Sequence, residues 1–237
     1  MKLVQRYDYV PIERINLSGR RHYKCPKTGQ SLVSVTSVLD STADKSGLLE
    51  WRKRVGDKKA NEIQKEALGL GTLMHTHLEC HLANTARPTG NNLVRLQAAA
   101  MADQIIEQGL SQIDEVYGSE VSLYYPGLYA GTADGVGLYH GEPCIFDFKT
   151  ARKMKKLEHI QDYLLQLCAY ILCHNELYGT AIKTGIIFMV DRDFNYQQFT
   201  LEGSEFQDKT MAWIGRLDRY YENKLTIPHL PVNPVLE

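Results

Sequence analysis

The segment GTADGVGLYHGEPCIFDFK, residues 131–149, places two aspartates and a lysine on a predicted β-hairpin. Its second half, CIFDFK, is rich in the aromatic and β-branched residues that are typical of strands. Strand side chains alternate between two faces, so Phe146 and Phe148 share one face. Asp147 and Lys149 share the other. We expect the phenylalanine face to be buried and the charged face to carry the functional residues.

The turn of this hairpin falls at residues 140–143, His-Gly-Glu-Pro. Pro143 has no backbone N–H to donate, which argues against the tightest two-residue closure. We therefore expect a four-residue loop with Tyr139 opposite Cys144.

This register would bring three charged side chains together. Asp134 falls opposite Lys149 and diagonal to Asp147, and such neighbours on one face lie roughly 5–8 Å apart. Two carboxylates so close repel each other unless a cation lies between them, and Mg²⁺ prefers oxygen ligands of this kind. The alternative is an ordinary surface ion pair between Asp134 and Lys149, with Asp147 solvated.

Length and composition are those of an ordinary globular protein. The chain has 237 residues, 43% hydrophobic and 23% charged, with a net charge of −1, so it is not a basic nucleic-acid coat. It contains no apolar run of membrane-spanning length and no signal peptide at its start, so we expect a cytoplasmic location and no membrane partner. The five cysteines are odd in number and lack C-x-x-C spacing, which indicates neither a disulfide framework nor a metal cluster.

Two helical segments carry polar residues at suggestive positions. Residues 69–72, Gly-Leu-Gly-Thr, lead into a predicted helix on which His75 and Glu79 share a face. The predicted helix at 157–178 is apolar nearly all round except for Gln166, whose amide needs a hydrogen-bond partner if buried. Tyr170 lies four residues further along, so both polar tips can reach the same neighbour.

A basic run follows the hairpin directly. It begins with Arg152 and Lys153, immediately after the carboxylates. A polyanion could bridge the two groups, so we expect these residues to bind nucleic acid. The alternative is a solvated charged surface.

Four motifs in order resemble those of the PD-(D/E)XK nuclease superfamily, in its RecB-like exonuclease branch. They are Gly71-x-x-x-His75, Gly131-x-x-Asp134, Asp147-x-Lys149 and Gln166-x-x-x-Tyr170, and together they span about residues 69–190. Residues 34–54 further resemble the segment before the first motif in mitochondrial genome maintenance exonucleases and their phage relatives. The chain lacks the four cysteines that hold an iron–sulfur cluster in some members of the superfamily.

The resemblance implies a role for each matching residue. His75, Asp134, Asp147 and the backbone carbonyl of Phe148 would be metal ligands, and Lys149 would position or help deprotonate the attacking water. Gln166 and Tyr170 would steady the active-site strand and touch the DNA backbone. Glu120 matches a less regular acidic position before the hairpin.

The implied fold is α/β, with a central mixed β-sheet flanked by helices as in restriction endonucleases. We expect a single nuclease domain, with a helical lobe at 36–112 over the active site, an α/β core at 113–223 and an extended tail at 224–237. Helices at 44–68 and 93–110 would form an arch that admits a threaded strand. Tyr124, Tyr125, Tyr129 and Trp51 are available to stack on bases, although core packing is the more ordinary role for such residues.

The implied activity is a DNA exonuclease that needs Mg²⁺ or Mn²⁺, one or two ions, and acts on free single-stranded ends. No iron–sulfur cluster is expected. The chain could be phage-encoded and act in the host cytoplasm, with a recombination or replication protein as partner. Three alternatives stay open: an endonuclease of the same superfamily, a derivative that binds DNA without cutting it, and a structural metal-binding protein.

Overall fold

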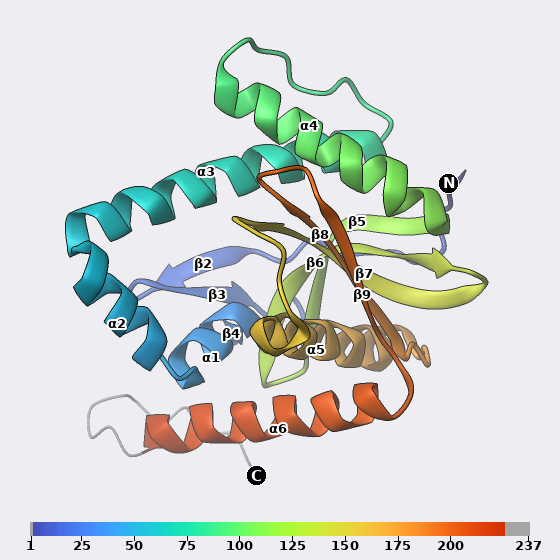
Figure 1. The fold of residues 1–237 in the computed structure, drawn as a ribbon. Helices are drawn as coiled ribbons and strands as arrows, with labels where there is room; N and C mark the ends of the chain where they lie inside the picture. The colour runs from blue at the N-terminus through green and yellow to red at the C-terminus, as the bar shows by residue number, and fades with distance from the viewer. Residues whose placement is uncertain (1, 226–237) are drawn as a thin grey trace.

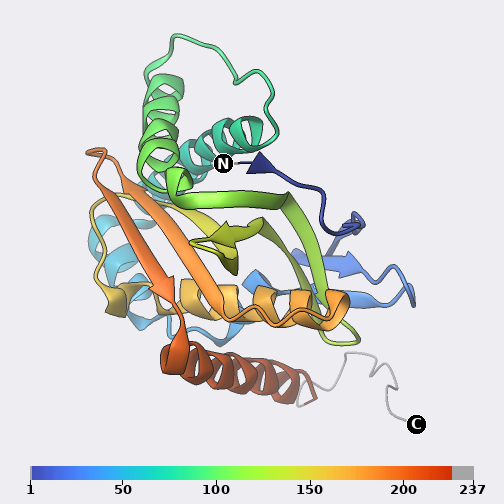
Figure 2. The same cartoon turned by 90° about the vertical axis from the view of Figure 1, so that its right-hand side faces the viewer.

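In the computed structural model, which describes residues 2–225, a nine-stranded mixed β-sheet lies between two layers of helices (Figures 1 and 2). This confirms the predicted fold class. The strands run in the order β2-β3-β4-β6-β7-β8-β9, with β5 paired to β6 and β1 paired to β5. Their bounds are β1 Lys2–Leu3, β2 Arg14–Leu17, β3 Arg20–Lys24, β4 Ser31–Ser34, β5 Ile113–Tyr125, β6 Tyr129–Tyr139, β7 Glu142–Ala151, β8 Thr184–Asp191 and β9 Tyr196–Leu201.

The helices divide between the two faces of the sheet (Figure 1). On one face α3 and α4 pack together, α4 against β8 and β9 and α3 against β5 and β7; on the other, α5 covers β5 to β8 and contacts α1 and α6. The helices are α1 Val35–Thr42, α2 Ser46–Val55, α3 Asp57–Leu82, α4 Leu93–Gln108, α5 Gln161–Tyr178 and α6 Gly203–Leu225, with short 3-10 turns at Leu110–Gln112 and Leu157–His159. The extended tail expected at 224–237 lies, from residue 226 on, outside the described residues.

Both faces of β7 are buried. Phe146 and Phe148 pack into the apolar core beneath α3 and α4, as the alternation predicts. The opposite face lies under α5, where Ile145 joins the second core. Asp147 is consequently only 2% exposed, which excludes the alternative in which it is solvated.

The turn of the hairpin differs from the expectation. Only His140 and Gly141 form the loop, both with positive φ (48° and 82°), and Tyr139 pairs with Glu142 instead of Cys144. In such a turn the residues that flank the loop exchange the backbone hydrogen bonds, so Pro143 falls in a non-hydrogen-bonded pair with Leu138. The nitrogen of Pro143 thus points away from β6, where no N–H is required, and the argument against a two-residue turn was wrong.

The helical lobe also differs in two details. Helix α3 runs without a break through Gly69 and Gly71, so these glycines are interior residues and not a helix entry. Helix α4 buries Met101 and Ile105 against the sheet, and none of its residues lines the cleft described below. The predicted arch therefore does not include α4. Across residues 2–225, no helix has both the length and the apolar character needed to cross a membrane.

Candidate active site

A cleft of about 990 Å³ opens where α3 faces the sheet. Residues from four parts of the chain line it: α3, the β2–β4 region with the start of α1, strands β5 to β7, and α5. All four resemblance motifs contribute to its wall. The lining residues that match these motifs are Gly71, His75, Gly131, Asp134, Asp147, Phe148, Lys149, Gln166 and Tyr170.

The two aspartates lie at the edge of β6 that faces β4 and β7, while the other edge stays paired with β5. Strand β6 pairs with β4 at Tyr129 and Ala130 and with β7 from Gly135 onward, so residues 131–134 lie in a gap between the two ladders. Asp134 fills this gap: its Oδ2 accepts a hydrogen bond of 2.7 Å from the backbone N–H of Phe148. The corrected register therefore sets Asp134 beside Asp147 rather than opposite Lys149.

A chain of polar contacts leads from Lys149 into α5. Its ammonium donates to Asp147 Oδ2, and the other oxygen of that carboxylate accepts from Gln166 Nε2 at 3.3 Å. Gln166 Nε2 also lies 3.0 Å from the hydroxyl of Tyr170. The half-buried amide of Gln166 thus has hydrogen-bond partners, and it holds the Asp147 carboxylate from the side of α5.

Burial and neighbouring charges act in opposite directions on these groups. Burial, reinforced by the charge of Asp147, raises the pKa of Asp134 well above its usual range. Burial alone would lower the pKa of Lys149, but the charges of Asp147 and Asp134 outweigh it and raise that pKa. Lys149 is therefore an ammonium in this arrangement.

His75 reaches the same place from α3. Its Nε2 lies 3.0 Å from the Phe148 carbonyl oxygen, and because a carbonyl only accepts, Nε2 carries the hydrogen. Its Nδ1 lies 3.7 Å from Asp134 Oδ2. Burial lowers the pKa of His75, so the ring is neutral and Nδ1 offers a lone pair on the side of Asp134.

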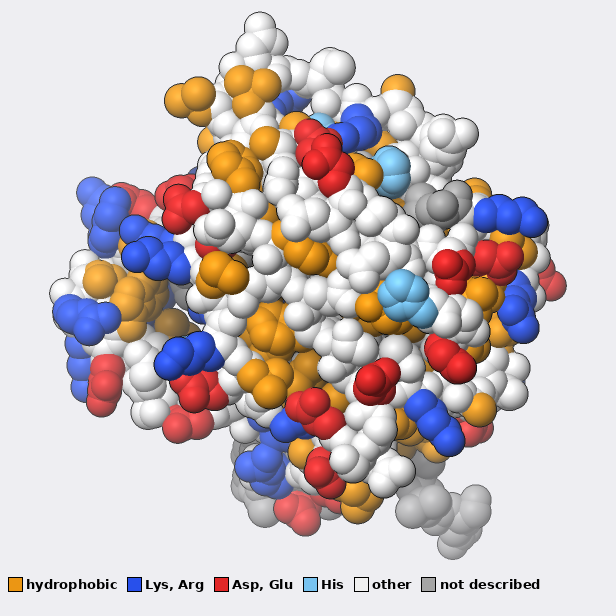
Figure 3. Space-filling model, turned by 45° about the vertical axis from the view of Figure 1, so that its right-hand side comes forward, with side chains coloured by type: hydrophobic (Ala, Val, Ile, Leu, Met, Phe, Trp, Pro, Cys, Tyr) orange, Lys and Arg blue, Asp and Glu red, His pale blue; other side chains and the backbone are white. Residues whose placement is uncertain are grey.

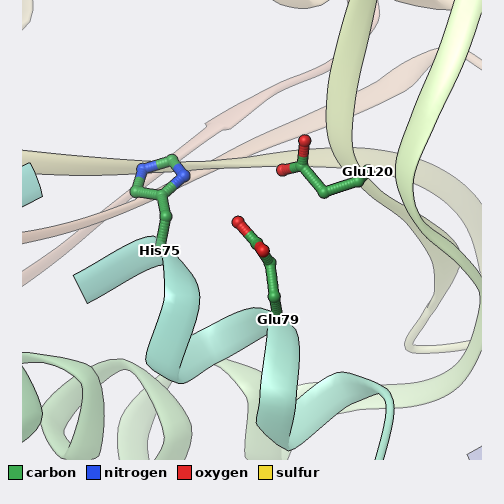
Figure 4. Close-up of side chains that lie close together, drawn as sticks. All are labelled: His75, Glu79 and Glu120. Carbon is green, nitrogen blue, oxygen red and sulfur yellow. The ribbon is translucent and has the colours of Figure 1, made fainter. Parts of the chain in front are cut away.

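Two glutamates, Glu79 and Glu120, also lie close to His75 (Figure 4). The side chains of His75 and Glu79 rise from α3, and Glu120 approaches them from β5, with one ligand atom of each within 4.8 Å of the others. Glu120 has a φ of 52°, in the left-handed region that costs a non-glycine residue free energy. Burial and the charges of Asp134 and Glu79 raise the pKa of Glu120 to about 7.

The donor set suits a hard divalent cation. Four carboxylates, on Asp134, Asp147, Glu79 and Glu120, face one ammonium. Neither glutamate side chain forms an ion pair or hydrogen bond among the described residues. Such a concentration of negative charge is stable when a cation shares it. Carboxylate and carbonyl oxygens with one imidazole nitrogen are ligands for Mg²⁺ and Mn²⁺.

Not every expected residue lies here. Arg152 and Lys153 are exposed just beyond β7 and do not line the cleft, so their role in nucleic-acid binding stays a prediction. Of the four aromatic residues considered for base stacking, none lines the cleft, and Tyr129 is fully buried beside Trp213. The sequence indicated a supporting role for Glu79, which shares a helix face with His75, and in the structure its carboxylate lies close enough to His75 and Glu120 to be a candidate ligand.

Two relatives found by sequence comparison are named as exonucleases. The chain is 28% identical over 213 residues to mouse mitochondrial genome maintenance exonuclease 1 and 27% identical over 215 residues to the human protein. These alignments cover 85% of this chain but only 62% and 61% of the relatives, so the chain spans about three fifths of their length. A scan against models of protein families finds no match.

The chain resembles PD-(D/E)XK nucleases.

Solved structures with some likeness also include exonucleases. A putative exonuclease from Eubacterium rectale has a TM-score of 0.49 at 13% identity, covering 73% of this chain and 76% of that one. An alkaline exonuclease from Laribacter hongkongensis has a TM-score of 0.35 at 17% identity, covering 82% and 93%.

Proposed function

We propose that the chain is a divalent-metal-dependent deoxyribonuclease that hydrolyses DNA from free single-stranded ends. One observation carries the proposal. Asp134, Asp147 and Lys149 lie together beside the unpaired part of β6, between its ladders with β4 and β7, and His75 of α3 approaches Asp134. The similarity to exonucleases named for mitochondrial genome maintenance supports the same reading.

The residues that would hold the ion are Asp134, Asp147, the carbonyl of Phe148 and Nδ1 of His75. A divalent ion bound there lowers the pKa of a coordinated water and neutralises charge on the phosphate. Mg²⁺ suits the oxygen ligands, and the imidazole makes Mn²⁺ a good substitute.

The protein's own groups prepare the site for phosphodiester hydrolysis. The Lys149 ammonium can donate to the attacking water and offset the negative charge that develops on the phosphate. Gln166 and Tyr170 fix the orientation of Asp147 through their hydrogen bonds. Gly131 lets Tyr170 approach, because a Cβ there would lie 2.5 Å from its ring. The expected products are 5′-phosphates and 3′-hydroxyls.

The test is digestion of end-labelled linear single-stranded DNA beside a circular single strand, with Mg²⁺, Mn²⁺ or EDTA. We expect the linear strand to be degraded, the circle to survive, and EDTA to stop the reaction. Lys149→Ala should reduce the rate at least 100-fold, on the order of one lost electrostatic contact to the transition state. Lys183→Ala is the matched control, since Lys183 is an exposed lysine that does not line the cleft.

Other outcomes separate the alternatives. Cleavage of the circle would replace the exonuclease by an endonuclease of the same superfamily. DNA retention without cleavage in any metal would favour a binding protein that has lost catalysis. Tight metal binding with neither cleavage nor DNA retention would favour a structural metal site.

A further inference from the structure

The β2–β3 hairpin and α3 lie on opposite sides of the space between them (Figure 1). Two arginines of this hairpin, Arg14 and Arg21, line the cleft. Arg14 pairs with Tyr23, and Arg21 pairs with Asn16, two positions further along the ladder. Arg14 and Arg21 are therefore diagonal neighbours on one face, with Cα atoms roughly 7–8 Å apart. Both arginines line the cleft. Tyr23 lines it as well, and its hydroxyl lies 3.4 Å from Oγ1 of Thr132 in β6.

Neither guanidinium has a partner in the part of the chain that the structure describes. Within residues 2–225, no ion pair or side-chain hydrogen bond involves the guanidinium of Arg14 or Arg21. Other arginines of the chain do pair with carboxylates: Arg52 with Asp57, Arg87 with Asp103, Arg192 with Glu66 and Arg216 with Asp162. The two charges in the cleft are thus available for a ligand.

The charges around Arg14 and Arg21 indicate the class of ligand that these two residues would bind. Among the residues that line the cleft, the basic ones are Arg14, Arg21 and Lys149, and Lys149 is paired with Asp147. The α3 residues between 64 and 72 that line the cleft carry no charge: they are Gln64, Ala67, Leu68, Gly71 and Thr72. A polyanion that enters this space is repelled by the carboxylates of the floor and attracted by the hairpin, so it would lie against the hairpin.

We propose that Arg14 and Arg21 bind phosphodiester groups of the substrate strand beside the scissile bond. The inference rests on the proposed function and extends it by naming where the strand runs. Guanidinium groups bind phosphate oxygens through paired N–H donors, and such contacts position a strand without reading its sequence. The β2–β3 hairpin is in this reading the phosphate-binding wall of the cleft, and α3 is the opposite wall.

The hairpin offers its own matched control. Arg20 neighbours Arg21 but pairs with Leu17 and faces the other side of the hairpin, away from the cleft. Arg14→Ala, Arg21→Ala, the double variant and Arg20→Ala would be compared in a Lys149→Ala background with Mg²⁺, so that a bound strand is not cut. Affinity for a fluorescent oligothymidylate is read by anisotropy between 50 and 300 mM salt, after thermal melting confirms that each variant is folded.

We expect each of Arg14→Ala and Arg21→Ala to weaken binding about tenfold, as for a hydrogen bond to a charged group. Each should also reduce the slope of log affinity against log salt by about 0.7, the value for one phosphate contact on a single strand. Arg20→Ala should change affinity less than about twofold. Arg20→Ala with Lys149 restored should hydrolyse both linear single-stranded DNA and the small diester bis(p-nitrophenyl) phosphate at the wild-type rate, because Arg20 does not line the cleft.

The results distinguish this inference from the proposed function. An unchanged salt slope in the double variant overturns the phosphate-binding wall, even if the wild type cuts DNA. A reduced salt slope supports the phosphate-binding wall. If neither DNA nor the small diester is hydrolysed while the slope is reduced, the nuclease proposal fails and phosphate binding by the hairpin stands. If polyglutamate binds more tightly than oligothymidylate and depends on the same arginines, the ligand is an acidic peptide and the inference is wrong.

Discussion

At the scale of single residues, Lys149 is held by two different neighbours. Asp147 accepts its hydrogen bond, and the ring of Tyr163 lies 4.9 Å from its nitrogen. A cation over an aromatic face gains about 0.5–2 kcal/mol, more when it is away from water. Tyr163 therefore contributes to where the ammonium lies, and is a positioning residue for the proposed reaction.

Tyr163→Leu is expected to lower kcat about tenfold with little change in KM, since the ammonium loses one of its two constraints. Tyr163→Phe keeps the ring face and should stay within about twofold of the wild type. Steady-state kinetics on a short single-stranded oligonucleotide with Mn²⁺ would measure both. Equal losses in the two variants would assign the effect to the hydroxyl group and contradict the role of the ring.

The residues of the site were predictable to different degrees. The faces of Phe146, Phe148 and Asp147 follow from period-two alternation, which is local and needs no tertiary information. The spacing of His75 and Glu79 shows that they share a helix face, but not that Glu120 meets them from β5. Arg14 and Arg21 gave no signal at all, because an arginine becomes distinctive only when its lack of an acidic partner is seen.

At the scale of elements, the hairpin register shows how a local rule can mislead. The objection to a two-residue turn assumed that the N–H missing at Pro143 was needed, and this depends on which edge of the strand the residue faces. The β7–β8 ladder begins at Cys144, one residue later, so no partner is deprived. The two-residue turn shifts Asp134 from Lys149 to Asp147, and with it the pairing of charges in the site.

Helix α3 offers a test of the glycine interpretation. Gly69 lies in the helix interior, and a Cβ added there meets no atom within 4 Å. Gly69→Ala should therefore raise the free energy of unfolding by about 0.5–1 kcal/mol, because alanine loses less backbone freedom on folding. Urea denaturation would measure it. A loss of stability would mean that the helix needs a break at this position, as the sequence first indicated.

Strand β6 should respond in the opposite way. A Cβ on Gly135 would lie 2.0 Å from the ring of Phe146, its cross-strand partner, and Phe146 is fully buried. Gly135→Ala should therefore lower the free energy of unfolding by about 1–3 kcal/mol through overpacking. The same urea titration applies, with Gly69→Ala as the control for an added methyl group. A neutral result would show that the phenylalanine can move aside.

At the scale of the whole molecule, the cleft joins segments that are distant in the sequence. The hairpin at 14–24, the helix at 57–82, the strands at 113–151 and the helix at 161–178 each supply part of its wall. Motif order predicts which of these segments meet, but the walls between motifs depend on tertiary packing that no local pattern contains. Base stacking by Trp51, Tyr124, Tyr125 and Tyr129 was considered from the sequence, but none of these residues lines the cleft.

A second long-range connection lies away from the cleft. His174 of α5 is fully buried; its Nε2 lies 3.0 Å from the hydroxyl of Tyr9, and its Nδ1 lies 2.8 Å from Oγ1 of Thr180. The rings of Tyr7, Tyr9 and Tyr178 surround it. This cluster attaches the N-terminal segment to α5, and among the described residues the rings that contact His174 are those of tyrosines.

Burial lowers the pKa of His174 to about 4, against about 6.5 in an unfolded chain. Between these values the unfolded state binds the proton and the folded state does not. The contribution of the neutral His174 ring to the free energy of unfolding is therefore fully present above about pH 6.5. It is lost as the pH falls to about 4, for a total on the order of 3 kcal/mol.

Urea denaturation at several pH values should show that His174→Gln loses less stability than the wild type between pH 6.5 and pH 4, since the variant has no proton to take up. His159→Gln, which removes an exposed histidine, should keep the wild-type slope. If His174→Gln follows the wild type at every pH, the buried ring is not what couples folding to pH, and the carboxylates of the cleft would have to account for the dependence.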